Sequence, residues 1–373
     1  MAHSLTYGMD IPSMLRALKD EKFLLLALLV AVAVYPLEHS LLGGGKLLAG
    51  ITATALLAVI IGVSLRVAHH AEVLAEKVGE PYGTMILTLA AVLVEVVILA
   101  IMMGHNHSPT LARDTIYAAV MLDMNGILGL AALLGGLKHG EQSYNDDSGK
   151  TYVTMILTAV GISMVVPELI PAEQWKLYSF FTIGCMVMLY ALFLRMQTGQ
   201  HSYFFSYNYA AHGEHAEGHE AAGNSKQSMG LLVVGVVLIG ALAEVMSKAL
   251  DVGLEGSGVP PIVPALLVAA ISASPEILTA LRAAMANRMQ PVVNIALGAS
   301  LSTVILTVPV IEALALFKGQ PIQMAMTPLQ TGMMFITLMV AGYNLHDGKT
   351  NAIEGMTHFV LFATFLMLSF MGL

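Results

Sequence analysis

The sequence of 373 residues contains little charge and a single cysteine. Only 11% of its residues are Asp, Glu, Lys or Arg, whereas globular domains carry about 25%, and 57% are hydrophobic. Cys185 lies within an apolar run, so a disulfide framework is excluded, and we interpret this residue as a small buried hydrophobe. A composition this apolar is typical of a protein that crosses a membrane many times.

Other absences each exclude a class of function. The net charge of −8 leaves no basic surface for nucleic acid. The sequence has no HExxH, GxSxG or P-loop motif, so we expect neither an enzyme of those classes nor ATP-driven transport. It also has no mid-span lysine for retinal and no histidine deep in a predicted span for haem, so no cofactor is expected. The N-terminus lacks the cleavage site of a signal peptide.

Eleven apolar runs, bounded by charged residues, Gly, Pro and Asn, predict an all-α polytopic membrane protein with about 11 transmembrane helices. The predicted spans are Phe23–Leu42, Leu47–Val67, Thr84–Met103, Thr115–Leu137, Thr151–Ile170, Leu177–Met196, Met229–Ala249, Ile262–Ala286, Val292–Phe317, Thr327–Tyr343 and Met356–Leu373. Most Lys and Arg residues fall in loops on the side of the N-terminus. This bias predicts a cytoplasmic N-terminus and an external C-terminus in the cell membrane, here the bacterial inner membrane.

The spans divide into two similar units. A tail and leading helix (residues 1–45) precede a five-helix unit (46–197), a polar cytoplasmic linker (198–228) and a second five-helix unit (229–373). An odd number of spans in each unit forces the two repeats into inverted topology.

Glu95 and Glu276 stand near the middle of the second span of each unit. An ionised side chain at this depth costs roughly 2.5–3.5 kcal/mol on insertion scales, so a pair of them indicates function. Carboxylates are hard ligands for Ca²⁺, Na⁺ or K⁺ and can carry protons instead. We expect the two to meet near the midplane and to bind either a cation or protons.

Polar neighbours support a binding site around these acids. Ser272 and Thr279 share a helix face with Glu276, Pro275 frees a backbone carbonyl one turn earlier, and Thr88 shares the face of the first glutamate. All are expected to lie on the ion pathway.

The third span of each unit carries further small polar residues. Asn294, Gly298 and Ser302 form a stripe that either lines a pathway or allows close helix packing. Asp123 and Asn125 stand two residues apart, so a regular helix would not turn both towards one cavity. Asp123 is therefore either on a secondary proton route or a protonated group bonded to another helix.

Glutamates recur near the ends of other spans. Glu72 and Glu244 end the first span of each unit and are candidates for a sliding gate. For Glu38, Glu168 and Glu312, solvation at the membrane interface is the better explanation.

The linker contains His212, His215 and His219 among several glutamates. This cluster could bind a divalent ion or sense pH, but its spacing matches no defined zinc site. A solvated acidic loop that keeps cations near the cytoplasmic mouth is the plainer interpretation.

Residues 74–104, 110–142 and 273–310 resemble the cation/calcium exchanger superfamily, and within it the ChaA-type calcium/proton (sodium, potassium/proton) antiporters. The resemblance implies a leading helix and two inverted five-helix repeats, with Glu95 and Glu276 as ion ligands. It also places Asn125 and Ser302 at ligand positions. The Gly-Asn-Ala that precedes each glutamate in the calcium-selective branch is absent here, so the identity of the ion does not follow from the resemblance.

The sequence thus predicts a secondary active antiporter that exchanges cytoplasmic Ca²⁺, or else Na⁺ or K⁺, for external H⁺ by alternating access. Its expected partners are membrane lipid, protons and inorganic cations, and its oligomeric state is not predicted. A cation channel and a cation-sensing membrane protein without proton coupling are the alternatives.

Overall fold

The computed structural model describes residues 21–78, 82–105, 108–199, 201–207, 225–260, 262–319 and 322–372. In that part of the chain, 10 helices are long and apolar enough to cross a membrane. A further helix of 17 residues, α13 (Pro328–Asn344), lies where the tenth span was predicted. The predicted all-α polytopic fold is therefore confirmed. The linker histidines His212, His215 and His219 lie outside the described residues.

The other spans begin and end close to the predicted positions, with the exception of α3 and α9, which have 33 and 30 residues and are longer than expected. Their bounds are α2 Lys22–Gly43, α3 Lys46–Val78, α4 Tyr82–His105, α5 Leu111–Met121, α6 Leu128–His139, α7 Asp146–Val160, α8 Trp175–Thr198, α9 Ser225–Leu254, α10 Val263–Met285, α11 Met289–Ser302, α12 Val308–Lys318 and α14 Ala352–Phe370. One short antiparallel pair, β1 (Gln142–Ser143) with β2 (Lys349–Thr350), joins two loops.

Three spans contain a π-helix, in which the backbone turn is one residue wider. The segment η1 (Leu122–Ile127) joins α5 to α6, η6 (Thr303–Thr307) joins α11 to α12, and η2 (Gly161–Val165) follows α7. Such turns are rare and are frequent at functional sites. The first two interrupt the third span of each predicted repeat, so the two halves share a local distortion as well as a helix order.

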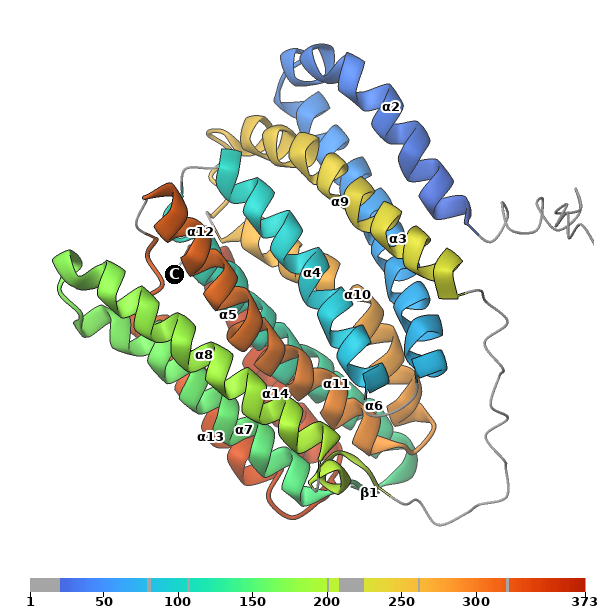
Figure 1. The fold of residues 1–373 in the computed structure, drawn as a ribbon, viewed down its shortest axis with the longest axis vertical. Coiled ribbons are helices and arrows are strands. Elements are labelled where there is room, and N and C mark those ends of the chain that lie inside the picture. The colour runs from blue at the N-terminus through green and yellow to red at the C-terminus, as the bar shows by residue number, and fades with distance from the viewer. Residues whose placement is uncertain are drawn as a thin grey trace, which may run out of the picture.

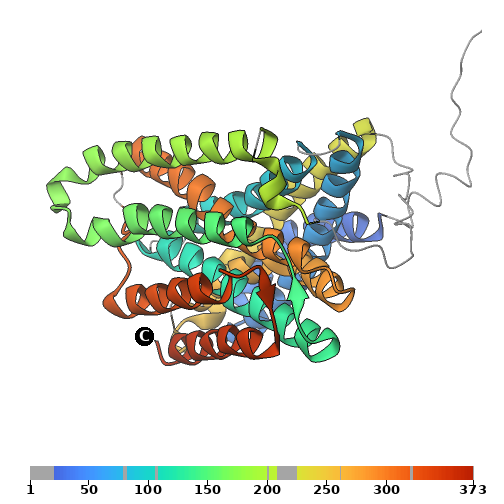
Figure 2. The ribbon, with the colours of Figure 1, turned by 90° about the horizontal axis from the view of Figure 1, so that it is seen from below.

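The helices form a slab in which the two halves interlock (Figure 1, Figure 2). The long helices α3 and α9 pack along each other on one side, and α2 covers them. In the middle, α10 of the second half packs against α5 and α6 of the first, and α11 packs against α4. The remaining helices, α7, α8, α12, α13 and α14, lie on the other side. Each half therefore supplies helices to the centre of the other.

Helix α2 is attached to α3 at one end and to α9 at the other. At its start, the Arg66 Nε donates to Glu21 Oε2 over 3.1 Å. Near its other end, the Lys248 Nζ donates to Glu38 Oε1 over 2.9 Å, and the Tyr35 hydroxyl reaches the Ala241 carbonyl at 3.2 Å. The leading helix thus ties the two long helices together.

Glycines bring α6 and α14 into backbone contact. A Cβ added at Gly129 would lie 2.7 Å from the Phe359 nitrogen, and one at Gly355 would lie 2.2 Å from the Leu133 nitrogen. Distances under 3.0 Å are not seen for real Cβ atoms. Helix α14 is therefore held at a fixed position on the first half, by contacts that only glycine allows.

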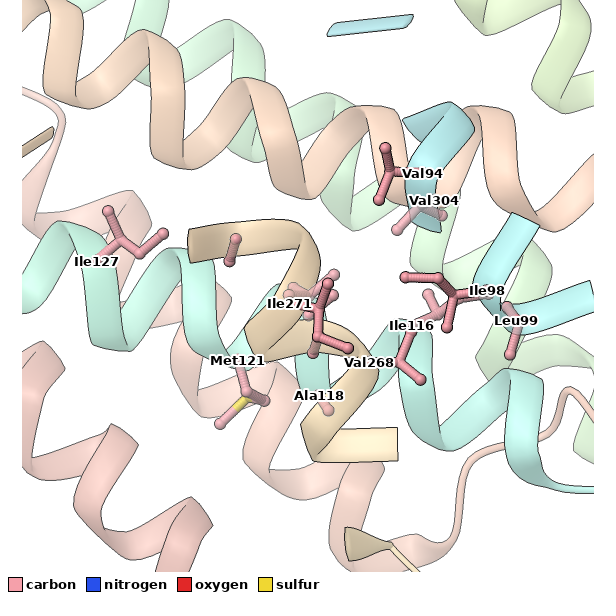
Figure 3. Close-up of a cluster of buried hydrophobic side chains, with 14 of the residues drawn as sticks. Val94, Ile98, Leu99, Ile116, Ala118, Met121, Ile127, Val268, Ile271 and Val304 are labelled. Atoms are coloured by element: carbon pink, nitrogen blue, oxygen red, sulfur yellow. The ribbon is translucent and has the colours of Figure 1, made fainter. Parts of the chain in front are cut away.

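Apolar side chains surround the centre of the slab (Figure 3). Val94 and Ile98 of α4, Ile116 of α5, and Val268 and Ile271 of α10 are each at most 2% exposed. Polar groups among them have little access to water, so each must find a partner or a ligand.

Candidate cation-binding site

A cavity of about 320 Å³ opens between the two halves and is lined by residues of α3, α4, α5–η1, α10 and α11–η6. Glu72 and Thr279, which are exposed, line one end of it. Glu95 and Asp123, each only 2% exposed, line the other end. The cavity therefore runs from the surface, where α3 ends and α4 begins, to the buried centre.

Besides the exposed Glu72, three carboxylates line this cavity: Glu95 from α4, Asp123 from η1 and the partly buried Glu276 from α10. Asp123 lies close enough to both glutamates for their charges to repel. Among the described residues that line the cavity, none is Lys, Arg or His. Burying three acids with no basic partner is expensive unless cations or protons neutralise them.

Two polar side-chain atoms at the buried end of the cavity have no hydrogen-bond partner in the described structure. The Thr303 hydroxyl donates to Glu95 Oε2 over 2.9 Å, whereas Glu95 Oε1 has no partner in the described structure. The Ser300 hydroxyl donates to Asp123 Oδ2 over 3.4 Å, and the buried Ser302 hydroxyl has no partner there. Unsatisfied carboxylate and hydroxyl oxygens on residues that line one cavity are the arrangement expected of a site that binds an ion.

The two π-helices place their polar residues reciprocally. Thr303 at the start of η6 contacts Glu95 of the other half, and Asp123 near the start of η1 faces Glu276 of the other half. Sequence reasoning missed Thr303 and Ser300. The neighbouring Ser302 was found because it fits a regular helical stripe, whereas Thr303 reaches the site through the wider π-turn.

Most of the other predicted site residues also line the cavity, namely Ser272, Thr88, Asn294, Ser302 and Glu72. The Ser272 hydroxyl is bonded to its own helix, at the Ala269 carbonyl (3.0 Å). The side chain of Asn294 is held by the Phe205 carbonyl at 2.8 Å.

Proline has the predicted effect on α10. Pro275 cannot donate to the Ile271 carbonyl, which instead accepts hydrogen bonds from the Ser274 hydroxyl at 2.8 Å and the Ser64 hydroxyl at 3.4 Å. The freed carbonyl thus joins α10 to α3 beside the cavity, because Ser64 is a lining residue.

Asn125 does not reach the cavity, contrary to the ligand role expected for it. Its Nδ2 donates to the Thr337 hydroxyl over 2.8 Å, and its Oδ1 lies 3.0 Å from His358 Nδ1. His358, near the start of the last predicted span, is 2% exposed and lies within α14. Asp123 and Asn125 do face different directions, as their spacing predicted.

Two other glutamates lie away from the cavity, and one of them differs from expectation. Glu244 does not line the cavity: it accepts from the Lys248 Nζ at 3.1 Å and from the Tyr35 hydroxyl at 3.2 Å. Glu312 is only 2% exposed, so interfacial solvation does not explain it. Helix α8 packs on α12, the helix that carries Glu312, and hydropathy alone could not predict this packing.

Comparison with known proteins is consistent with this arrangement. The family model described as sodium/calcium exchanger protein matches residues 47–199 and 227–371. The chain belongs to this family.

Individual proteins of known sequence or structure are similar to this chain over most of its length. The sodium-potassium/proton antiporter ChaA of Escherichia coli (strain K12) is 31% identical over 335 residues, which cover 88% of this chain and 92% of that protein. Among solved structures, native YfkE matches with a TM-score of 0.72 at 17% identity, covering 92% of this chain and 99% of that one. The H⁺/Ca²⁺ exchanger CAX matches with a TM-score of 0.64 at 15% identity, covering 96% and 89%. These matches confirm a multi-pass membrane protein with the exchanger fold.

Proposed function

We propose that this protein is a secondary active cation/proton antiporter that exchanges cytoplasmic Ca²⁺, or else Na⁺ or K⁺, for external H⁺ by alternating access. One observation carries the proposal: Glu95, Asp123 and Glu276, from both halves, meet at the buried end of one cavity whose described lining has no basic residue. The similarity to transporters of this family, including a sodium-potassium/proton antiporter, supports it.

The three carboxylates can bind a cation or a full set of protons, but they cannot bind the cation and all the protons at the same time. A divalent cation neutralises two of them, and one proton shared by the three keeps the dry site neutral. Two protons must then replace the cation when it leaves, because two bare carboxylates in this cavity would repel each other. This exclusion couples the two fluxes.

The oxygen inventory favours Ca²⁺ over the monovalent ions. Ca²⁺ takes six to eight oxygens at about 2.3–2.6 Å, and three carboxylates with the Ser302 hydroxyl approach that number. The name of the Escherichia coli relative keeps Na⁺ and K⁺ as candidates.

The proposed orientation places the N-terminus in the cytoplasm of a bacterium and the C-terminus outside its inner membrane. In this orientation the exposed end of the cavity, at Glu72, faces the cytoplasm, so the structure corresponds to the inward-facing state. Helices α3 and α9 are then the candidates for the sliding gate. Residues 46–197 and 229–373 remain the proposed repeats, joined by the linker 198–228.

The proposal is tested in everted membrane vesicles with an imposed proton gradient, using a pH-sensitive dye inside. Adding Ca²⁺, Na⁺, K⁺ or Mg²⁺ separately should dissipate the gradient for at least one of the first three. Glu95→Gln and Glu276→Gln should abolish the dissipation. The control Glu312→Gln, which neutralises an equally buried acid outside the cavity, should retain it.

Two results would contradict antiport. One is a gradient that persists with every cation although the protein is inserted. The other is a cation current that flows at equal pH on both sides with no proton movement, which would indicate a channel.

A further inference from the structure

The buried histidine of α14 belongs to a chain of hydrogen bonds that includes Asn125, which stands two residues from Asp123. The Asn125 Nδ2 donates to the Thr337 hydroxyl, and that hydroxyl lies 3.6 Å from the Met121 sulfur. The remaining amide atom, Asn125 Oδ1, can only accept, so His358 Nδ1 carries the proton of the 3.0 Å bond between them. His358 Nε2 has no partner in the described structure.

This chain holds a distorted segment of backbone. Asn125 and Asp123 both belong to the π-helix η1, and they point to opposite sides of it. A π-turn is rare and occurs mostly as a single turn within an α-helix, so we expect it to persist where its surroundings fix it. If η1 relaxed to a regular helix, the face on which Asp123 lies would rotate away from the cavity.

Helix α14 is a rigid support for such a bond. His358 stands at the backbone contact between α14 and α6, where a Cβ at Gly129 would lie 2.9 Å from the His358 Cβ. Because these glycines fix α14 on the first half, the position of the imidazole is fixed as well. Asn125 is wholly buried, so water cannot substitute for the lost donor.

We propose that His358 is a positioning residue: through its bond to Asn125 it holds η1 in the register that turns Asp123 into the cavity. The side chain does not line the cavity, so it is not expected to contact the transported ion. The inference deepens the proposed function, but it concerns geometry and can be tested without transport.

The experiment measures how accessible position 123 is from the cavity. Replacing Cys185, the single cysteine, with Ser gives a background in which Asp123→Cys introduces the only thiol. The full-length protein in detergent is labelled with a positively charged methanethiosulfonate, and the labelling rate is compared between His358 variants. His358→Leu removes the donor. His358→Asn keeps a donor near the Nδ1 position and is the rescue variant.

We expect His358→Leu to slow labelling of the thiol at position 123 by about tenfold or more, the range in which supporting partners of a site act. His358→Asn should stay within about threefold of the parent. Ser369→Ala, a buried change elsewhere on α14, should have no effect. A second thiol, introduced by Ser302→Cys in the same background, should label at an unchanged rate and so show that the cavity is intact.

An unchanged labelling rate at position 123 in folded His358→Leu would overturn the proposal, and so would an equal fall at position 302. If His358→Leu does not yield folded protein, Asn125→Leu breaks the same bond from the other helix and must give the same selective loss. Selective loss of labelling at position 123, together with an absence of cation transport by the protein with Asp123 intact in the vesicle assay, would support this inference while contradicting the proposed function.

Discussion

The hydroxyl of Thr303 is the hydrogen-bond donor to the Glu95 carboxylate in the described structure, at 2.9 Å. Replacing Thr303 with Val keeps the branched shape and removes the donor. A hydrogen bond to a charged group contributes about 1.5–3 kcal/mol, and its loss leaves a buried oxygen unsatisfied. This energy corresponds to roughly 10- to 150-fold in an equilibrium constant.

We therefore expect Thr303→Val to raise the half-saturating cation concentration by roughly 10- to 150-fold. The physical reason is that the second half of the chain no longer stabilises the ionised carboxylate of the first, which the cation needs. The measurement is dye dissipation in everted vesicles over a cation series at fixed pH. Protein amount in each vesicle batch is normalised by immunoblot.

Two companion variants decide the interpretation. Thr303→Ser retains the hydroxyl and should stay within about threefold of the parent, since a single methyl is lost. Thr158→Val removes an exposed hydroxyl that bonds only to its own helix and should be silent. If Thr303→Val transports like the parent, or if Thr303→Ser is equally impaired, the hydrogen bond does not contribute as argued.

Three further predictions concern other parts of the molecule. Asp123→Asn should raise the half-saturating cation concentration by about tenfold or more while turnover continues, because two carboxylates remain to exchange protons; complete loss of transport would contradict this. Gly129→Ala should lower the melting temperature in detergent or abolish folding, since its Cβ would lie 2.7 Å from a backbone nitrogen of α14, whereas Gly184→Ala, with open space around it, should not. Burial alone would raise the pKa of Glu21, but the hydrogen bonds and charge of its arginine partner on α3 lower that pKa below the usual 4.5. The stabilisation is thus complete above pH 4.5 and is lost as the pH falls through the lowered pKa, so Glu21→Gln should reduce the melting temperature at about pH 7 and should have a progressively smaller effect as the pH falls below 4.5, with the exposed Glu173→Gln as control.

Hydropathy was sufficient to predict the helices, because every span must be apolar over the thickness of a bilayer. The same reasoning located Glu95 and Glu276, since an acid within an apolar run is costly wherever it faces. It could not show which acids meet. Asp123 joins the pair, and Glu312 does not, through the way helices from the two halves pack.

The other residues of the site could not be predicted, because helical periodicity assumes that every span is a regular α-helix. The stripe through Ser302 was derived for about 3.6 residues per turn, and the π-helix moves Thr303 into contact with Glu95 instead. Asn125 was placed at the ion through a motif position, but the structure turns it towards α14. His358 was overlooked because it stands close to the start of the last predicted span, where a polar side chain is ordinary.

The attachment of α2 has a consequence for how the bilayer acts on this protein. Leu29 and Val32 of α2 are 68% and 67% exposed, so lipid tails press on this helix. The ion pairs at its two ends join it to α3 and α9, so we expect α2 to move with that pair if the pair slides during transport as proposed. Membrane thickness and viscosity are then expected to influence the exchange rate through α2 as well as through the exposed apolar side chains of α3 and α9 themselves.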